Sequence, residues 1–408
     1  MRHLLPFFVA LILIAVLLRL DFAFYVAYVL GGLWLLARIG YRRSLERLRW
    51  ERRCPSHAFL GDRPLVEMTV YNPGRLPLPW LRLADTVPPS LFGAAEARQV
   101  MALGGHERSC FRYHLDCQRR GYYTLGPLQI GGGDPLGLLE MERQGEDVTS
   151  LTVYPRIIPL GGLDVDSRQP LVGFPAPRRL FEDPARLAGV RPYRSGDSIR
   201  RIHWKLSAHV GDLQVKKVEP AIGLAGVILL NLNRDEFHPR TWDGVSEWGI
   251  TLAASLAYHL GRAGQAIGLL VHGQDPLHPG HSPSPLPPRG GNAHLMQVLE
   301  TLARVVPASL TPFAAWLPTA TLDLPWGVNL LVVSPHADAT LLVALHQQHR
   351  RGLGVVLFVT EPYQDFAVVQ GRAQRLGLSA HNLAHEHELR RWSQQAGILS
   401  HVTSRPFF

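Results

Sequence analysis

The sequence predicts a multi-domain membrane protein that combines an α-helical transmembrane hairpin, an antiparallel β-sandwich and a doubly wound α/β domain. Three observations support this prediction: two apolar stretches near the start of the chain, alternating runs with turns from Pro64, and alternating strand and helix patterns after Pro220. A length of 408 residues allows about two or three domains. A composition of 46% hydrophobic and 18% charged residues excludes a disordered chain.

The first predicted element is a two-span hairpin over residues 1–40. No charged residue interrupts Leu4 to Leu18 or Phe22 to Ala37, and Arg19-Leu20-Asp21 separates the two stretches. Each stretch lies at or just below the roughly 17 to 25 residues that a tilted helix needs to cross a bilayer. A cleaved signal peptide is the alternative, but no small-residue cleavage site ends the first stretch. The hairpin makes membrane lipid an expected partner.

A basic segment over residues 41–54 follows. Between Arg38 and Arg53 the chain has seven arginines and two glutamates, a net charge of +5. The positive-inside rule places such a segment in the cytoplasm, together with everything that follows it. Three cysteines in a chain of this length fit a reducing compartment.

Residues 55–160 predict the β-sandwich. Residues 65–71 alternate between apolar and polar side chains, and Asn72-Pro73-Gly74 then supplies turn residues. Similar runs occur at 80–83, 110–115, 121–130 and 151–154. Short alternating runs between turns are typical of a small antiparallel sandwich.

Residues 161–220 form a basic motif segment. Between Arg178 and Lys217 there are ten Lys or Arg and four Asp or Glu, a net charge of +6, and the chain's three lysines all lie here. Either a solvated basic face or a contact with a partner or a phosphate explains this charge. The candidate interaction residues are Arg194, Gly196, Asp197, Arg200, His203, Trp204, Lys205, Ser207, Lys216 and Lys217.

The same segment allows a less favoured catalytic interpretation. Asp197, His203 and Ser207 lie close in sequence, and such groups can form a nucleophile and its base. No known nucleophile motif accompanies them, and the chain has no P-loop and no dinucleotide-binding glycine pattern. The sequence therefore predicts no catalytic residues, and any ATP hydrolysis would come from a partner.

Residues 221–408 predict the α/β domain. Strand-like runs at 225–232, 266–271, 328–333 and 354–360 alternate with helix-like runs at 245–261, 293–305, 339–350 and 363–376. This order is typical of a doubly wound domain, in which ligands bind at the carboxyl ends of the strands. We also expect His381 and His385 to share an exposed helix face near His387.

A resemblance to a known family rests on several of these segments. The run from Tyr193-Arg194-Ser195-Gly196-Asp197 to Ile202-His203-Trp204-Lys205, and on to Val215-Lys216-Lys217, resembles the signature of the bacterial domain of unknown function 58 family. Residues 119–127, 134–138 and 153–155 resemble the sandwich segment of that family.

The resemblance implies a protein of the bacterial inner membrane whose soluble part is cytoplasmic. It also implies a C-terminal domain similar to von Willebrand factor A and a partnership with an AAA+ ATPase of the MoxR type. The family is not known as an enzyme family.

A domain of that type holds a divalent cation through an Asp-x-Ser-x-Ser motif, and the matching positions here are Asn231, Asn233 and Asp235. Asn231 lacks the charge of the leading carboxylate, and Arg234 adds a positive charge beside it. Ser334-Pro335-His336 follows a later strand where the family has an aspartate. We therefore expect a degenerate metal position, no bound metal and no cofactor, with Mg²⁺ as the one weak alternative.

These features together predict an adaptor or assembly factor that is not an enzyme. The combined net charge of the two basic segments is greater than the net charge of the whole chain, which is +9. The remainder of the chain is therefore slightly acidic and is not expected to form a nucleic-acid surface. The predicted function is to dock a protein partner, with a MoxR-type AAA+ ATPase as the first candidate. A structural, envelope-associated protein without an ATPase partner is the alternative, and a cryptic hydrolase is a third.

Overall fold

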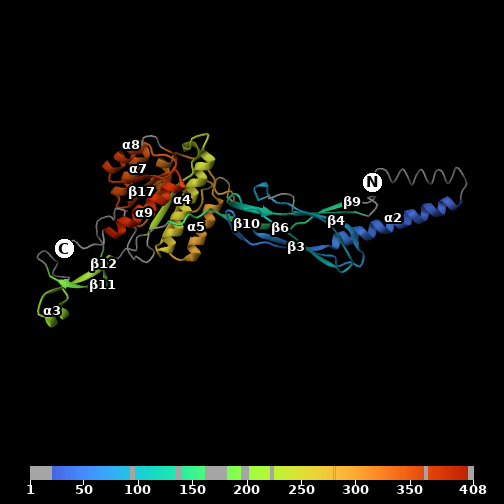
Figure 1. Ribbon diagram of the computed structural model, residues 1–408, viewed down its shortest axis with the longest axis horizontal. Coiled ribbons are helices and arrows are strands. Elements are labelled where there is room, and N and C mark those ends of the chain that lie inside the picture. The colour runs from blue at the N-terminus through green and yellow to red at the C-terminus, as the bar shows by residue number, and fades with distance from the viewer. Residues whose placement is uncertain are drawn as a thin grey trace. The chain divides into compact units, whose positions relative to one another are not determined.

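The structure is a computed structural model of the chain. It describes residues 21–91, 97–133, 140–160, 182–193, 202–220, 225–278, 280, 282–362 and 366–402. The chain divides into two compact units, Met1–Pro155 and Arg156–Phe408, which are described separately below. Figure 1 shows the course of the chain through both units.

The N-terminal unit contains one described helix followed by short strands that form three sheets. Its elements are α2 (Asp21–Arg47), β1 (Arg49–Arg53), β2 (His57–Phe59), β3 (Leu65–Tyr71), β4 (Leu78–Asp85), β5 (Arg98–Leu103), β6 (Arg108–His114), β7 (Gly121–Leu125), β8 (Leu128–Gly133), β9 (Glu140–Gln144) and β10 (Thr149–Tyr154). The sheets have the orders β1-β3-β6, β2-β10-β7 and β5-β4-β8-β9. All strand pairs in this unit are antiparallel except β2 with β10, so this unit is not a purely antiparallel sandwich.

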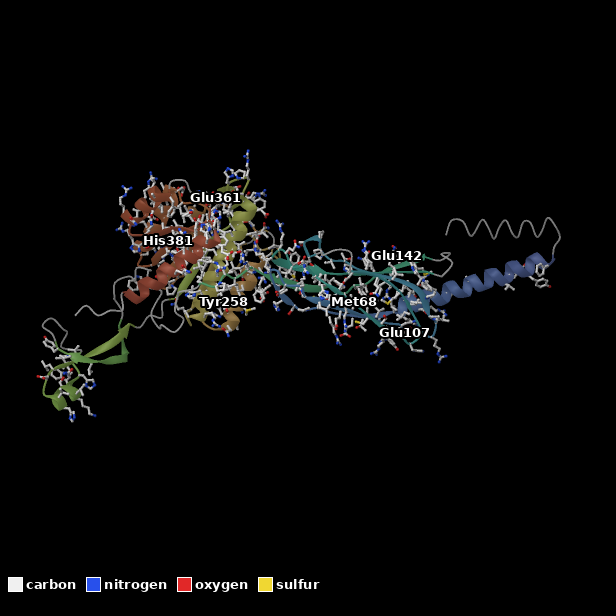
Figure 2. All side chains as sticks on the ribbon, viewed as in Figure 1. Met68, Glu107, Glu142, Tyr258, Glu361 and His381 are labelled. Atoms are coloured by element: carbon white, nitrogen blue, oxygen red, sulfur yellow. The ribbon has the colours of Figure 1, made fainter. Side chains whose placement is uncertain are left out.

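The three sheets share one hydrophobic core. Alternate residues of β3 enter it, and Val66, Met68 and Val70 are fully buried. Met68 is labelled in Figure 2. The C-terminal end of α2 also belongs to this core, because Tyr41 and Leu45 are buried in it and the Tyr41 hydroxyl donates to the Trp80 carbonyl at 2.8 Å. The basic segment over residues 41–54, which was expected beside a membrane, therefore forms the end of α2 and strand β1.

The predicted transmembrane hairpin is wrong. None of the helices that the structure describes has the length and apolar character needed to cross a membrane, and α2 is the helix that contains the predicted second span. The physical reason is length: Arg38 ends the uncharged stretch that begins at Phe22, which leaves it short of the ~20 apolar residues of a span. The first span, Leu4 to Leu18, lies outside the described residues. The expected multi-pass location in the inner membrane is therefore corrected together with the hairpin.

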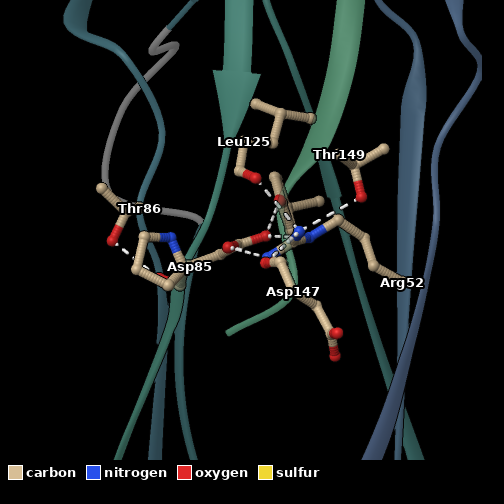
Figure 3. Close-up of polar contacts among 8 residues, drawn as sticks. Arg52, Asp85, Thr86, Leu125, Asp147 and Thr149 are labelled. Carbon is tan, nitrogen blue, oxygen red and sulfur yellow. Dashed lines mark hydrogen bonds and ion pairs between the residues drawn. The ribbon is translucent and has the colours of Figure 1, made fainter. Parts of the chain in front are cut away.

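Arg52, which we assigned to the basic membrane-facing segment, is instead buried in an ion pair. Its guanidinium donates to both carboxylate oxygens of Asp85, at 2.9 and 2.6 Å, and both side chains are almost fully buried. The third guanidinium nitrogen donates to the carbonyls of Leu125 and Asp147 and to the Thr149 hydroxyl (Figure 3). One side chain thus connects β1, β4 and the end of the β7–β10 pair at which Leu125 lies opposite Thr149.

The C-terminal unit contains a six-stranded sheet of order β15-β14-β13-β16-β17-β18. Its strands are β13 (Gly226–Asn231), β14 (Ile267–His272), β15 (Leu286–Arg289), β16 (Asn329–Ser334), β17 (Gly354–Val359) and β18 (Ser379–Asn382). All neighbours are parallel except β14 and β15. Strands β13, β14, β16 and β17 are buried along their whole length, as expected for parallel strands with helices on both faces.

Helices cover both faces of this sheet. They are α4 (Trp242–Arg262), α5 (Asn292–Arg304), α6 (Phe313–Ala320), α7 (Ala339–Arg350), α8 (Phe366–Arg375) and α9 (Glu386–Val402). Apolar residues of α6, α7 and α8 share a core with Val227, Leu330 and Leu357. Gly249 of α4 lies against Leu230 and Val333, which point to the opposite face. Because β14 and β16 lie on opposite sides of β13, the order of the strands reverses at β13, and a ligand cleft is expected at that point.

A two-stranded antiparallel sheet precedes the six-stranded one in the chain. Strand β11 (Glu182–Pro192) pairs with β12 (Gln214–Pro220), and the short helix α3 (Trp204–Val210) lies between them in sequence. We call these three elements the arm. The bridge between Ile202 and Val215, both buried, holds the start of α3 to the sheet.

Candidate functional site

The arm contains the described part of the basic motif. Of the candidate interaction residues, Arg194, Gly196, Asp197 and Arg200 lie outside the described residues. His203, Trp204, Lys205 and Ser207 belong to α3 or its N-cap, and Lys216 and Lys217 lie in β12, where they pair with Val190 and Gly189 of β11. The structure therefore brings together six of the ten predicted residues on adjoining elements.

His203 and Ser207 make hydrogen bonds that stabilise the arm itself. His203 is the N-cap of α3, and its Nδ1 accepts from the Leu206 backbone N–H at 3.2 Å. The Ser207 hydroxyl donates to the His203 carbonyl and accepts from the Gln214 N–H at 2.8 Å, which joins α3 to β12. The side chains of Ser207 and His203, which the catalytic interpretation would use as nucleophile and base, are thus both bonded to backbone groups.

Trp204 and Lys205, on the same helix, are exposed. The exposed fraction of Trp204 is 62%. Other large apolar side chains of the arm are also exposed, namely Val190, Tyr193, Val210 and Leu213. We call these six residues the arm tip. Its residues combine exposed apolar area with a lysine.

The degenerate metal position lies at the carboxyl end of β13. Asn231 is the last residue of that strand, and Asn233 is the N-cap of the short 3₁₀ turn Arg234–Glu236. Both amides donate to the carboxylate of Glu236: Asn231 Nδ2 to Oε2 at 2.7 Å and Asn233 Nδ2 to Oε1 at 3.2 Å. The Phe313 N–H at the start of α6 donates to the same Oε1 at 2.6 Å.

The orientation of both amides is fixed by backbone donors. The Asn233 N–H can only donate, and it bonds Asn231 Oδ1 at 3.0 Å, so Asn231 Nδ2 must face Glu236. In the same way, the Leu310 N–H bonds Asn233 Oδ1 at 3.0 Å and turns Asn233 Nδ2 inward. Two N–H₂ groups therefore point to the position where a cation would need oxygen ligands.

A divalent cation does not fit this donor set. The Glu236 carboxylate already accepts three hydrogen bonds, and Asp235 lies on the exposed side of the turn, where Ser309 donates to its Oδ1 at 2.9 Å. Across the described residues, His, Cys, Asp and Glu side chains form no group of three that could hold a metal ion. The geometry here favours an internal anchor, in which Glu236 ties the end of β13 to the start of α6.

A cleft of about 830 Å³ opens beside this anchor, between α6 and α7. Asn233, Asp235 and Glu236 line one end, and Asp338, the N-cap of α7, lines another part. Its apolar lining includes Ala314 and Ala315 of α6, and Leu341, Val343 and Ala344 of α7. The cleft lies at the carboxyl ends of β13 and β16, where doubly wound sheets bind ligands.

The sequence analysis missed Glu236, the residue that organises this end of the sheet. The signal was present, since a carboxylate directly follows the Asn-x-Asn-x-Asp pattern. Its partner Phe313 is 77 residues away, however, and only the tertiary structure brings the two together. Ser334, at the end of β16, accepts from Asn231 Nδ2 at 3.1 Å and so belongs to the same network.

The histidines near the C-terminus do not share a helix face as expected. His381 lies in β18 and packs against Phe358 and Trp392, at ring-centroid distances of 6.0 and 5.8 Å. His385 precedes α9 and stacks on His387. Burial lowers the pKa of His381, which favours the neutral imidazole.

Structural comparisons reveal weak likenesses to other proteins. The CARDB domain of the PF1109 protein from Pyrococcus furiosus is 14% identical over 26% of this chain and 94% of that one, with a TM-score of 0.20. A chain of the complex of Zinc 2-glycoprotein and Prolactin inducible protein from human seminal plasma is 11% identical over 26% of this chain and 92% of that one, with a TM-score of 0.21. The C-terminal domain of wzt is 14% identical over 27% of this chain and 75% of that one, with a TM-score of 0.22. Likenesses at this level carry no argument about fold or function.

Sequence comparison gives a more specific result. No curated protein matches the chain. The sequence signature of a family described as "Protein of unknown function DUF58" matches residues 189–324, which include most of the arm, the Asn231–Glu236 anchor and helix α6. This match places residues 189–324 of the chain in the DUF58 family of proteins of unknown function.

Proposed function

We propose that this chain is a docking protein without catalytic activity, and that the arm tip binds an acidic surface of a partner protein. The family resemblance makes an AAA+ ATPase of the MoxR type the first partner to test. On this proposal the chain acts as an adaptor or assembly factor, and the ATPase supplies the energy of any reaction cycle.

The exposure of Trp204 is the observation that carries the proposal. A tryptophan that is 62% exposed leaves a large apolar area in water, and burial of such area in an interface is favourable by roughly 25 cal/mol per Å². Tryptophan is also strongly enriched among the residues that dominate binding energy in protein interfaces. The internal bonds of His203 and Ser207 stabilise the arm that presents this side chain.

Charge indicates the kind of partner. Lys205 is exposed next to Trp204, and the segment from Arg178 to Lys217 has a net charge of +6. A basic surface attracts an acidic one and rejects basic partners, so it sets specificity and association rate more than affinity. The apolar residues beside Lys205 favour a folded protein surface over a nucleic-acid backbone, which would contact mainly the charges.

The test is a direct binding measurement between the purified chain and the MoxR-type ATPase of the same cells, in the presence of ATP. Trp204→Ala should weaken binding about tenfold or more, and Lys205→Glu should slow association. Arg372→Glu, on exposed α8, is the matched charge-reversal control and should bind like the parent chain. No binding by the parent chain, or equal loss in the control, would overturn the proposal.

A further inference from the structure

We propose that the cleft between α6 and α7 is a second binding site, and that its occupant is the arm tip of another copy of this chain. This inference uses the arm tip of the proposed function but requires no ATPase. It is measured on the purified chain alone, so either proposal can fail without the other.

The cleft provides room for a large apolar side chain. Ala314, Ala315 and Ala344 contribute small side chains to its wall, and α7 adds Val343, which is 52% exposed. At about 830 Å³, the cleft lies within the range of typical ligand pockets, which is roughly 300–1,000 Å³. The indole of Trp204 therefore has both an apolar wall to contact and the space to enter.

The cleft is also electrostatically complementary to the arm. Asp235, Glu236 and Asp338 contribute carboxylates, and no Lys or Arg occurs among its lining residues in the described part of the chain. The nearest arginine in sequence, Arg234, stacks over the Trp242 ring at 4.5 Å from its centroid. Asp235 and Asp338 are exposed, and in a chain of net charge +9 they make this cleft an acidic region.

The arm tip is the complementary segment that the chain itself offers. Lys205 follows Trp204 in α3 and both side chains are exposed, so one short helix offers a cation and a large apolar side chain. Lysine rather than arginine suits exposed carboxylates that already have other donors, because its ammonium group needs no fixed bidentate geometry. We therefore infer that Trp204 enters the cleft while Lys205 meets the carboxylates at its rim.

This contact joins two different surfaces, so it is heterologous. Each copy that docks its arm leaves its own cleft free and can accept the arm of a further copy. The purified chain should therefore associate in a concentration-dependent way and form species larger than dimers. Partner binding at the arm tip would compete with this association.

The test is sedimentation of the full chain and of matched variants over a wide range of concentrations. Val343→Glu should weaken association about tenfold or more, because it places a charge in the apolar wall of the cleft. Val368→Glu is the matched control, since Val368 is 53% exposed on α8 and does not line the cleft. Trp204→Ala should weaken association to a similar degree.

Mixing experiments identify the two surfaces as partners. A chain with Trp204→Ala retains its cleft, and a chain with Val343→Glu retains its arm tip, so an equal mixture should form dimers that do not grow further. Lys205→Glu should weaken association, and the added change Asp235→Lys should restore it by exchanging the charges. Circular dichroism of each variant checks that it is folded.

Three outcomes would overturn this inference. The first is a parent chain that stays monomeric at every concentration. The second is equal association by the Val343→Glu and Val368→Glu variants. The third is a mixture of the arm and cleft variants that gives no dimer, because complementation is then absent although both variants are folded.

Discussion

At the scale of single residues, Arg52 and Asp85 form the most consequential contact in the N-terminal unit. Both side chains are almost completely buried, and the Tyr113 hydroxyl also donates to Asp85. Burial, together with the Asp85 carboxylate, raises the pKa of Tyr113 well above its usual value. Because two buried charges satisfy each other here, the removal of one leaves the other without compensation.

Asp85→Asn should therefore destabilise the N-terminal unit strongly. We expect a loss of about 3–5 kcal/mol in the free energy of unfolding, since Arg52 stays charged and buried without its partner. Urea denaturation followed by circular dichroism measures this change. Glu51→Gln, which breaks the exposed ion pair with Arg53, is the control and should leave the midpoint nearly unchanged. Equal midpoints for both variants would contradict the assigned role of Asp85.

At the scale of elements, the arm depends on how α3 is attached to β12. The Ser207 hydroxyl is one link between them, beside the His203 N–H, which donates to the Gln214 carbonyl at 2.7 Å. Gly211 ends the helix in a left-handed conformation with φ of +84°. In this conformation a side chain would be strained, so glycine is favoured there. The exposed residues of α3 contribute to neither feature.

Ser207→Ala should separate stability from binding within the arm. The loss of its hydrogen bond leaves the partly buried Gln214 N–H without that acceptor, which should cost about 1–3 kcal/mol locally. Hydrogen exchange should accelerate at the amides of α3 and β12. Ala208→Ser, at an exposed position of the same helix, is the matched control. Unchanged exchange in the Ser207 variant would mean that another contact holds α3 in place.

At the scale of the whole molecule, the two units have separate cores and should respond differently to pH. Among the described residues, burial lowers the pKa of three histidines: His259, His272 and His381. All three belong to the C-terminal unit. The His272 Nε2 bonds the Thr311 carbonyl at 2.7 Å, which requires the imidazole to donate at that nitrogen.

Acidification should therefore destabilise the C-terminal unit. An unfolded histidine has a pKa of about 6.5, so below that pH the unfolded chain takes up protons that the folded chain does not. Stability should be constant above about pH 6.5 and should fall below it, until the lowered folded pKa is reached. The slope can approach about 1.4 kcal/mol per pH unit for each such histidine.

Unfolding of the full chain on either side of pH 6.5, followed by hydrogen exchange and mass spectrometry, tests this expectation for each unit. His381→Phe keeps a ring against Phe358 and Trp392 and should reduce the slope in the C-terminal unit. A slope that this variant leaves unchanged would show that His381 does not contribute to it.

Local pattern alone located much of the C-terminal unit. The apolar run at 225–232 predicted a buried strand, and β13 occupies Gly226–Asn231; the periodicity at 245–261 predicted a helix, and α4 occupies Trp242–Arg262. These predictions depend on side chains within one segment, so sequence suffices for them. The exposure of Trp204 could not be predicted in this way, because nothing in its neighbourhood distinguishes a packed from an exposed indole.

By itself, the sequence determined the β-rich first part of the chain, the parallel strands, the basic motif and the loss of the leading carboxylate at Asn231. Only the tertiary structure decided that Arg52 pairs with Asp85 and that Glu236 anchors α6. The physical reason is the range of the interactions. Periodicity is a property of neighbouring residues, whereas the burial and pairing of a charge depend on partners far away in the chain.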